Sequence, residues 1–233
     1  MAERPLYVPK KSGPLLVKTE MVSFRWFAGM AISQKQKSID ALHSAAREKG
    51  LCVNPLEVSS KSPSPLGVAL SAFNLESVTI KHQRRFTVET AFQSSKVFER
   101  GGPDRDLLFV SSREAKKDSR IQESGKLVRF EFFGEVWALE PKTAFYDWLY
   151  IKALTRNESL ADEVGQYDAF TDIEFNPERS INCQAYSLAL YLALSRRGLL
   201  REALDNKEAF LSILKSLPVN NTYENTAAQP RLL

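Results

Sequence analysis

The sequence predicts a single α+β domain that is mostly helical and carries a small β-sheet. The chain has 233 residues, of which 43% are hydrophobic and 26% are charged, and this suffices for one sizeable core. It contains no internal repeat and no long linker. Hydrophobic residues recur at helical spacing in most segments, and they alternate as in a strand in only a few.

The first third of the chain mixes expected strands with one clear helix. Residues 1–22 contain three prolines among basic and apolar residues, which predicts an N-terminal extended arm or a short edge strand. A helix of about 15 residues is expected to follow, with Ser33 as its N-cap and Gly50 at its end. The next segments are expected to be a strand, a loop and a pair of strands, over residues 51–59, 59–67 and 68–80.

Two polar helices are expected in the middle of the chain. Thr87 is a candidate N-cap for a helix whose apolar stripe runs to Phe98, before Gly and Pro residues at 101–103 end it. Ser111 or Ser112 is expected to cap a second, strongly charged helix that reaches residue 120.

The last third is predicted to contain a hairpin and then helices. Alternation over residues 126–139 predicts a β-hairpin that turns near Gly134. An amphipathic helix, a nearly buried helix and a last helix capped by Asp205 are expected over residues 142–154, 182–197 and 205–217. Polar composition predicts that residues 218–233 are a disordered tail, so the main domain is expected to span residues 23–217.

Composition excludes several classes of protein. A formal net charge of +4 permits an anionic partner, but a purely electrostatic nucleic-acid binder usually carries a larger excess in runs. The chain lacks an apolar stretch of roughly 18 residues and an apolar signal segment, so we expect a cytoplasmic protein with no membrane partner. Cys52 and Cys183 are the only cysteines and are expected to be reduced thiols, a single disulfide being the alternative.

Familiar catalytic motifs are also missing. With two histidines in the chain, a His-rich metal site or a Ser/His/Asp triad is not expected. The sequence has no Walker loop and no GxGxxG, GxSxG or HExxH motif, which removes the commonest nucleotidase, dehydrogenase, hydrolase and zincin interpretations. We therefore expect no metal and no cofactor.

Three polar segments remain as candidate sites. On a helix from Thr87, the side chains of Glu89, Gln93 and Lys96 would share one face while Phe92 turns inward; a solvated polar face is the alternative. Six acidic residues lie between residues 162 and 178 with no basic residue among them. Such a cluster can raise a carboxyl pKa for acid–base work, or it can be a solvated acidic loop. The charged helix at residues 113–120 is suited to bind phosphate or to lie on the surface.

Motifs in the same order and at the same spacing resemble the NADAR family over roughly residues 56–197. They are LGVALSAF, TVETAFQSSK, SSREAKKDSR, and FTD with a downstream Asn that opens a helix. The family patterns read approximately LSNF, TSEHxFQxxK, SSxxxA and WGD…N. Segments such as FRWFAGM, SSKVFERGGP and AFTDIEFNPERSINCQA resemble the bacterial subgroup paired with DarT-type toxins, which ADP-ribosylate guanine in DNA. The implied fold is a NADAR (YbiA-like) domain.

The chain departs from the family patterns at several positions. Ala72 replaces the Asn of LSNF, Thr90 replaces the His of the EH pair, and Phe170 and Thr171 replace the Trp and Gly of WGD. Contacts made by those family residues cannot be carried over. The residues that match are Glu89, Lys96, Asp172 and Asn182.

The resemblance implies removal of ADP-ribose from a modified guanine base by cleavage of an N-glycosidic bond. Such a reaction passes through an oxocarbenium-like state, which needs a carboxylate, an acid for the departing base and donors for the diphosphate. It assigns Glu89 as the first catalytic carboxylate and Asp172 as the second. Lys96 is expected either to attack the anomeric carbon and form a Schiff base, or to bind phosphate or a carboxylate.

The expected substrate-binding residues are spread over the chain. Trp26 is a candidate for the base pocket, with a place in the core as its alternative, and Phe170 can offer an aromatic face. The remaining candidates are Lys61, Phe92, Gln93, Arg113, Arg120 and Asn182. The expected partners are ADP-ribosylated DNA and, functionally, a DarT-type toxin, and the protein is expected to be a monomer.

Two other functions stay open from the sequence. One is an N-glycosidase acting on phosphorylated riboflavin-pathway intermediates, which shares the chemistry but not the substrate. The other is a non-catalytic module that binds ADP-ribosylated nucleic acid or the toxin itself. The subgroup wording favours the antitoxin, and the presence or absence of a DarT-like reading frame next to the gene would discriminate the two enzymes; retention of both Glu89 and Asp172 argues against the module.

Overall fold

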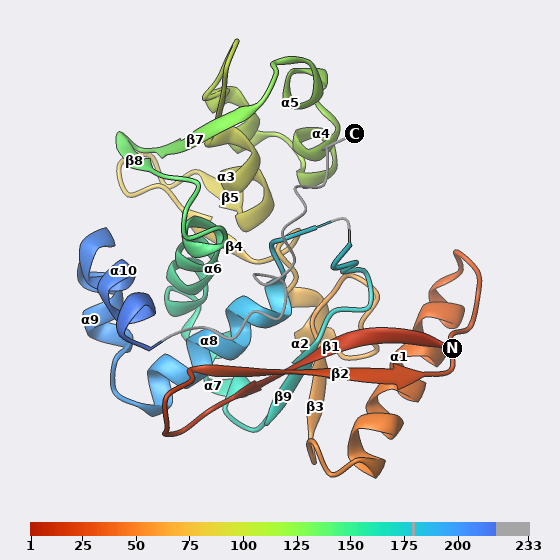
Figure 1. The fold of residues 1–233 in the computed structure, drawn as a ribbon. Helices are drawn as coiled ribbons and strands as arrows, with labels where there is room; N and C mark the ends of the chain where they lie inside the picture. The colour runs from red at the N-terminus through yellow and green to blue at the C-terminus, as the bar shows by residue number, and fades with distance from the viewer. Residues whose placement is uncertain (179, 218–233) are drawn as a thin grey trace.

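The computed structural model describes residues 1–178 and 180–217, and it confirms the predicted α+β class (Figure 1). The expected tail at residues 218–233 lies outside the described residues. In Figure 1 a four-stranded sheet and α1 form the lower part of the molecule, small sheets and short helices form the upper part, and α6 and α8 run between them. Among the described helices, none is long and apolar enough to cross a membrane.

The lower sheet has the order β2-β1-β9-β3. Its strands are β1 (Ala2–Pro9), β2 (Val17–Phe24), β3 (Pro55–Glu57) and β9 (Ala169–Thr171). The segment predicted as an arm or edge strand therefore contributes an inner strand, because β1 pairs with β2 on one side and with β9 on the other. Strand β3 runs parallel to β9, which brings the ends of both strands together.

Arg197 fixes the loop of this N-terminal hairpin. Its guanidinium donates hydrogen bonds to the carbonyl oxygens of Lys10, Ser12, Gly13 and Leu15, at 2.9 Å for Lys10 and 3.0 Å for Ser12 and Gly13. The Arg197 side chain thus provides hydrogen-bond donors to four carbonyl groups of the short loop that have no partner in a strand. This contact ties the start of the chain to the end of α8.

Helix α1 (Ile32–Glu48) covers one face of the sheet with Ile39, Leu42 and Ala46. The predicted helix is confirmed, but its N-cap position is Ala31 and no side chain caps it, so the expectation for Ser33 is wrong. The predicted strand over residues 51–59 is confined to β3. The predicted pair of strands at residues 68–80 is instead α2 (Pro65–Ala69) followed by β4 (Glu76–Val78).

The upper part contains α3, the helix that was predicted to begin after Thr87. Strand β5 (Arg85–Thr87) leads into α3 (Val88–Ser94), and the predicted cap is confirmed because Thr87 forms a capping box with Thr90. The helix ends at Ser94, four residues earlier than predicted. The hydroxyl groups of Ser94 and Ser95 both donate to the carbonyl oxygen of Ala91, at 3.1 and 2.6 Å, and so compete with the helical backbone.

The remaining upper elements surround α3. They are β6 (Lys96–Phe98), a 3-10 helix η1 (Arg105–Phe109), α4 (Ser112–Lys117), α5 (Ser119–Glu123), β7 (Leu127–Phe132) and β8 (Glu135–Trp137). The predicted hairpin is confirmed as β7–β8. The predicted charged helix is capped by Ser111 but is broken in two, because the Asp118 side chain accepts from the Arg120 N–H and starts α5.

Helices α6 (Ala144–Thr155) and α8 (Gln184–Arg196) pack against each other in the core. Helix α6 is buried all round rather than amphipathic, while α8 is nearly buried as predicted. The other helices are α7 (Glu158–Val164), α9 (Leu200–Asp205) and α10 (Lys207–Ser216). The expected last helix is confirmed as α10, while α9 was not predicted, and Asn206 rather than Asp205 caps α10 by accepting from the Ala209 N–H at 2.8 Å.

A buried polar contact joins α6 to α8. The Ser187 hydroxyl donates to Asp147 Oδ1 at 2.5 Å, and the Asp147 residue is 1% exposed. Burial raises the pKa of Asp147 to about 7. In the unfolded chain this carboxyl group ionises near pH 4. Between these two values the unfolded chain gives up a proton that the folded protein keeps, so stability falls as pH rises, and the loss is complete above about pH 7.

Substitution Asp147→Asn is expected to remove this pH dependence, because an amide keeps the shape of the protonated carboxyl group and does not ionise. Relative to the variant, wild type should lose on the order of 2 to 4 kcal/mol of unfolding free energy between pH 5 and pH 8. Urea unfolding at each pH measures it. Exposed Glu163→Gln serves as the control, and parallel curves for wild type and Asp147→Asn would contradict the assignment.

Candidate active site

Three buried carboxyl groups from different parts of the chain lie where the upper and lower parts meet. Glu57 ends β3, Asp172 directly follows the adjacent strand β9, and Glu89 lies in the first turn of α3. Their residues are 1%, 6% and 6% exposed respectively. Carboxyl groups are rarely buried to this extent unless they are bonded or functional.

The side-chain amide of Gln184, at the start of α8, links two of these carboxyl groups. Its Nε2 group donates to Asp172 Oδ2 at 2.9 Å, and its Oε1 accepts from the Ala72 N–H at 2.6 Å. The Ala72 carbonyl oxygen in turn accepts from the Glu89 N–H at 2.9 Å. Three hydrogen bonds in series therefore fix the first turn of α3 relative to Asp172.

Asp172 accepts further hydrogen bonds from its own loop. Its Oδ1 accepts from the N–H groups of Glu174 and Phe175, at 3.0 and 3.2 Å. Burial nevertheless raises the pKa of Asp172 above its usual range, because these donors only partly replace water. A carboxyl group of this kind keeps a proton near neutral pH and can donate it.

Glu57 is the residue of the site that the sequence interpretation missed. Its Oε1 accepts from the Ser59 hydroxyl at 2.6 Å and from the Ile173 N–H at 2.8 Å, and its Oε2 accepts from the Thr171 hydroxyl at 2.7 Å. Burial, and then the charge of Asp172, raise the pKa of Glu57. The sequence signal was present, because Glu57 is the one charged residue in an apolar strand segment.

His43 extends this network to α1. Its Nε2 lies 2.9 Å from the Thr171 hydroxyl oxygen. When Glu57 is ionised, the Thr171 hydroxyl donates its single proton to it, and His43 Nε2 then carries a proton and donates to Thr171. Burial, with a smaller effect from Arg47, lowers the pKa of His43 to about 4, so the ring is neutral at physiological pH.

Lys96 lies close to Glu89, although not in the way its spacing predicted. Because α3 ends at Ser94, Lys96 is the first residue of β6 and does not share a helical face with Glu89 and Gln93. Its Nζ is 4.9 Å from the centroid of the Phe92 ring. Burial lowers the pKa of Lys96 to about 8, the charge of Glu89 opposing this effect and that of Lys116 adding to it.

Neighbouring side chains complete the cluster around Glu89. Gln93 Nε2 donates to Glu89 Oε1 at 2.9 Å, as their i, i+4 spacing predicted. Tyr146, from α6, lies within electrostatic range of both Glu89 and Asp172, whose charges add to burial in raising its pKa. The amide oxygens of Gln93 and Asn182 are buried and accept no hydrogen bond within the described residues, which leaves them available to a ligand.

Trp26 and Lys61 lie at the border of this cluster. Lys35 Nζ is 5.0 Å from the Trp26 ring and 2.9 Å from the Glu174 carboxylate, in the same loop as Asp172. Lys61 follows Glu57 in the chain, and its N–H donates to the Ser59 hydroxyl that bonds Glu57. The Trp26 ring, which also packs against the core cluster of the lower sheet, is thus connected through Lys35 to the loop of Asp172, and the Lys61 backbone is connected to Glu57 through Ser59.

Three expected binding residues take other places. Phe170 is 0% exposed, and it lies in the sheet between Tyr7 and Leu56, so it presents no face to a base. Arg120 is held by the carboxylates of Asp104, Asp106 and Asp118 at 2.8 to 3.3 Å, so its charge is already matched. Arg113 is exposed on α4. The aromatic face expected of Phe170 is not available because its side chain lies within the hydrophobic core cluster.

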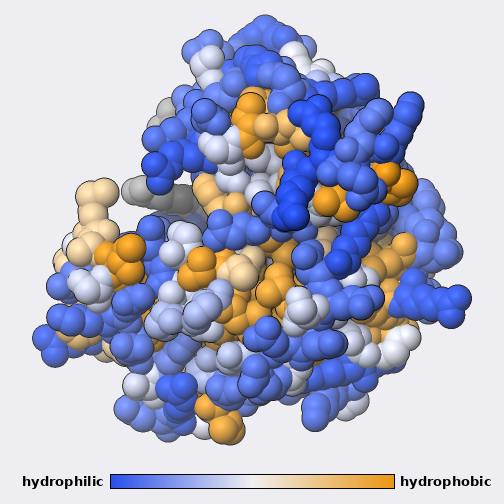
Figure 2. Space-filling model, turned by 180° about the vertical axis from the view of Figure 1, so that it is seen from behind, coloured by the Kyte–Doolittle hydropathy of each residue, from blue (hydrophilic) through white to orange (hydrophobic). Residues whose placement is uncertain are grey.

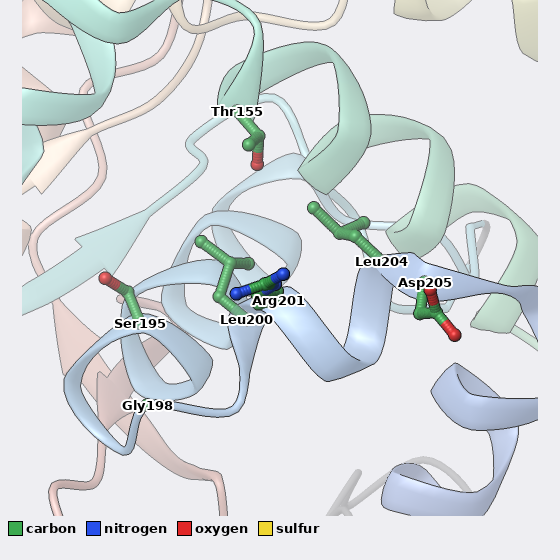
Figure 3. Close-up of a pocket in the computed structure, with 7 residues that line it drawn as sticks. All are labelled: Thr155, Ser195, Gly198, Leu200, Arg201, Leu204 and Asp205. Carbon is green, nitrogen blue, oxygen red and sulfur yellow. The ribbon is translucent and has the colours of Figure 1, made fainter.

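A surface pocket of about 650 Å³ lies elsewhere, between the end of α6, the end of α8 and α9 (Figure 3). Its lining residues are Thr155, Ser195, Gly198, Leu200, Arg201, Leu204 and Asp205. Ser195 is eleven residues along α8 from Gln184, which corresponds to about 17 Å. We place the chemistry at the carboxyl cluster, since this pocket holds one carboxylate and an arginine and no paired acids.

Within residues 1–178 and 180–217, no group of three His, Cys, Asp or Glu side chains is arranged to hold a metal ion. Cys52 and Cys183 are both buried and free. The described site itself offers carboxyl groups, amides and a lysine of lowered pKa.

Comparison with known proteins agrees with the motif resemblance. A family model described as DarT1-associated NADAR antitoxin matches residues 2–224. A comparison with curated proteins finds no match. The family match spans nearly the whole chain, including the N-terminal hairpin and all three buried carboxyl groups. The chain therefore belongs to the family of DarT1-associated NADAR antitoxins.

Proposed function

We propose that this protein removes ADP-ribose from modified guanine bases in DNA and so acts as the antitoxin to a DarT-type ADP-ribosyltransferase. The observation that carries the proposal is the arrangement of Glu89 and Asp172. The Asp172 carboxyl group is fixed to the first turn of α3 through Gln184 and Ala72, and Glu89 in that turn lies beside a lysine of lowered pKa. Membership of the antitoxin family supports the substrate.

Two carboxyl groups suit the cleavage of an N-glycosidic bond. Positive charge develops on the ribose as the bond to the base breaks, and the base departs more readily when it is protonated. Glu89 is the carboxylate that stabilises the positive charge. Asp172, whose pKa is raised by burial, is the acid that protonates the departing guanine.

Lys96 is suited to the covalent route. With a pKa of about 8, about one tenth of the lysine is neutral at pH 7, which is enough for a nucleophilic amine. The nitrogen lone pair attacks the anomeric carbon, guanine leaves with a proton from Asp172, and the ribose ring opens to give a Schiff base. Glu89 accepts the proton that the amine loses and passes it to the ring oxygen as the C1′–O4′ bond breaks, and Asp172 regains a proton from the water that attacks next. Water then adds to the Schiff base carbon and releases ADP-ribose and the free amine.

A structural feature favours this route over a carboxylate-pairing role for Lys96. Within the described residues, no carboxylate lies at ion-pair distance from its Nζ, and the nearest ring is that of Phe92. Burial disfavours the charged amine and so lowers its pKa. The two unpaired amide oxygens of Gln93 and Asn182 are suited to accept from ribose hydroxyl groups.

Substitution Glu89→Gln is expected to lower the rate of ADP-ribose release by about 100- to 10,000-fold, since the amide keeps the shape but cannot stabilise positive charge or take a proton. Release of free ADP-ribose from guanine-ADP-ribosylated DNA measures it. Exposed Glu163→Gln is the matched control. Release by Glu89→Gln at near the wild-type rate would refute the assignment, and wild type that binds this DNA without releasing ADP-ribose would instead identify a binding module.

Trapping with borohydride tests the lysine route. Wild type incubated with substrate and reductant should gain a stable ADP-ribose adduct on the peptide that contains Lys96, and Lys96→Arg should gain none. Because the amine must be neutral and Asp172 must be protonated, the rate should pass through a maximum near pH 7 to 8. Turnover without any adduct at Lys96, read by peptide mass mapping, would contradict the covalent route.

A further inference from the structure

Two neighbouring hairpin tips of the upper part carry strained backbone. Gln83 in the β4–β5 loop has φ of 51° and Phe133 in the β7–β8 turn has φ of 48°, and they are the non-glycine residues with positive φ in the described chain. A bulky aromatic residue in this region is an outlier. Phe133 and Gly134 form a two-residue turn with φ positive at both positions, where Asn-Gly is the favoured pair.

The strained Phe133 is also exposed. Its side chain is 69% exposed, so its ring contributes little to the core. Its centroid is 6.5 Å from that of Phe86, which belongs to the other hairpin. The two tips therefore lie side by side and share one aromatic surface. The Phe133 ring packs on Phe132, at 4.6 Å between centroids, and otherwise faces solvent; backbone strain at such an exposed residue is typical of a functional position.

Cations accompany these rings. The β4–β5 loop carries exposed Lys81 and Arg84, and the Arg84 guanidinium carbon is 3.4 Å from the centroid of Phe109, which is 36% exposed. Neither cation forms an ion pair within the described residues. Nearby carboxylates are engaged, since Glu131 pairs with Arg105 and Glu135 accepts from Trp137. In Figure 2 strongly hydrophilic and hydrophobic side chains lie next to each other in this upper half.

A continuous aromatic stack joins this surface to the candidate catalytic lysine. Lys96 is paired with Phe130 across β6 and β7, and Phe133 is three residues further on, roughly 10 Å along the chain. The ring contacts between them run through Phe92, Phe130, Phe145, Phe132 and Phe133, at centroid separations of 4.6 to 6.3 Å. At this distance from Lys96, the aromatic surface would lie beside the nucleotides that flank a base bound at Lys96.

We propose that the two hairpin tips bind the single DNA strand that flanks the modified guanine, with Phe133 stacking on a base and Arg84 and Lys81 facing the phosphates. This inference rests on the proposed function. Exposed aromatic rings next to unpaired cations suit single strands, because their bases are free to stack and every base has a flat face. Bases of a duplex are already stacked and offer no such surface.

The substitution Phe133→Asn separates binding from folding. Asn-Gly fits the turn better than Phe-Gly, so the melting temperature should equal or exceed that of wild type. The KM for a single-stranded ADP-ribosylated oligonucleotide should rise by roughly five- to 150-fold, the effect of losing one base stack. Neither kcat nor the KM for ADP-ribosylated guanosine, which has no flanking strand, should change.

Matched variants complete the test. Val53→Asn removes another exposed apolar side chain, 82% exposed in the loop before β3, and should leave both KM values unchanged. Arg84→Gln should reduce the salt slope of oligonucleotide binding by about one. The inference is overturned if Phe133→Asn keeps the wild-type KM for the oligonucleotide, or if its KM rises equally for the nucleoside.

Failure of the proposed function gives a different result, because wild type would then release ADP-ribose from neither substrate. In that case fluorescence anisotropy with an unmodified single-stranded oligonucleotide tests the surface directly. Weaker binding by Phe133→Asn than by wild type or Val53→Asn would support it. Equal binding by all three, or tighter binding of wild type to a duplex of the same sequence, would overturn it.

Discussion

The side-chain amide of Gln184 is the contact on which the site depends. The amide donates to the carbonyl oxygen of Val58 at 2.6 Å and to the Asp172 carboxylate, and it accepts from the Ala72 N–H. These three partners belong to separate segments, and Val58 and Asp172 are more than 100 residues apart in the chain. The same bonds fix Glu57, which precedes Val58, Glu89, whose N–H bonds Ala72, and Asp172 itself. Because an amide both donates and accepts, no aliphatic or charged residue of similar size can replace all three bonds.

Burial of these acids sets their chemistry and also works against stability. Glu57 and Asp172 accept six hydrogen bonds between them, yet burial still raises the pKa of each. Protonated carboxyl groups at neutral pH are useful to a reaction that needs an acid, but the ionised forms are costly to the fold. A structural ion pair would place a cation next to these carboxyl groups. In the described chain, no buried cation lies within salt-bridge distance of Glu57 or Asp172, so the site resembles a functional site instead.

The sequence predicted the regular elements better than their ends. Periodicity identified α1, α6, α8 and the β7–β8 hairpin, because these segments bury a repeated apolar pattern. It missed the end of α3, where two serine hydroxyls compete for one carbonyl group, and the break between α4 and α5 at Asp118, because side-chain to backbone bonds decide both. The sequence interpretation also missed α9 and placed the cap of α10 one residue too early, at Asp205 instead of Asn206.

The site was predicted only where a residue matched a motif. Glu89, Lys96 and Asp172 lie together, although the helical spacing used for Lys96 was wrong. Glu57 and Gln184 were missed because their partners are distant in sequence, and only the fold shows that β3 and β9 end side by side. Phe170 was misplaced because pattern does not distinguish an aromatic core residue of an inner strand from one that lines a pocket.

The two parts of the molecule contribute different residues to the candidate site. The lower sheet holds Glu57 and Asp172 at the ends of parallel strands, while the upper part supplies Glu89 and Lys96 from α3 and β6. Helix α8 joins them, and α6 packs on both α3 and α8. The separation between Asp172 and Lys96 is therefore set by packing in the core rather than by a surface loop, and under the proposed function a core substitution in α6 or α8 would change reactivity by changing this distance.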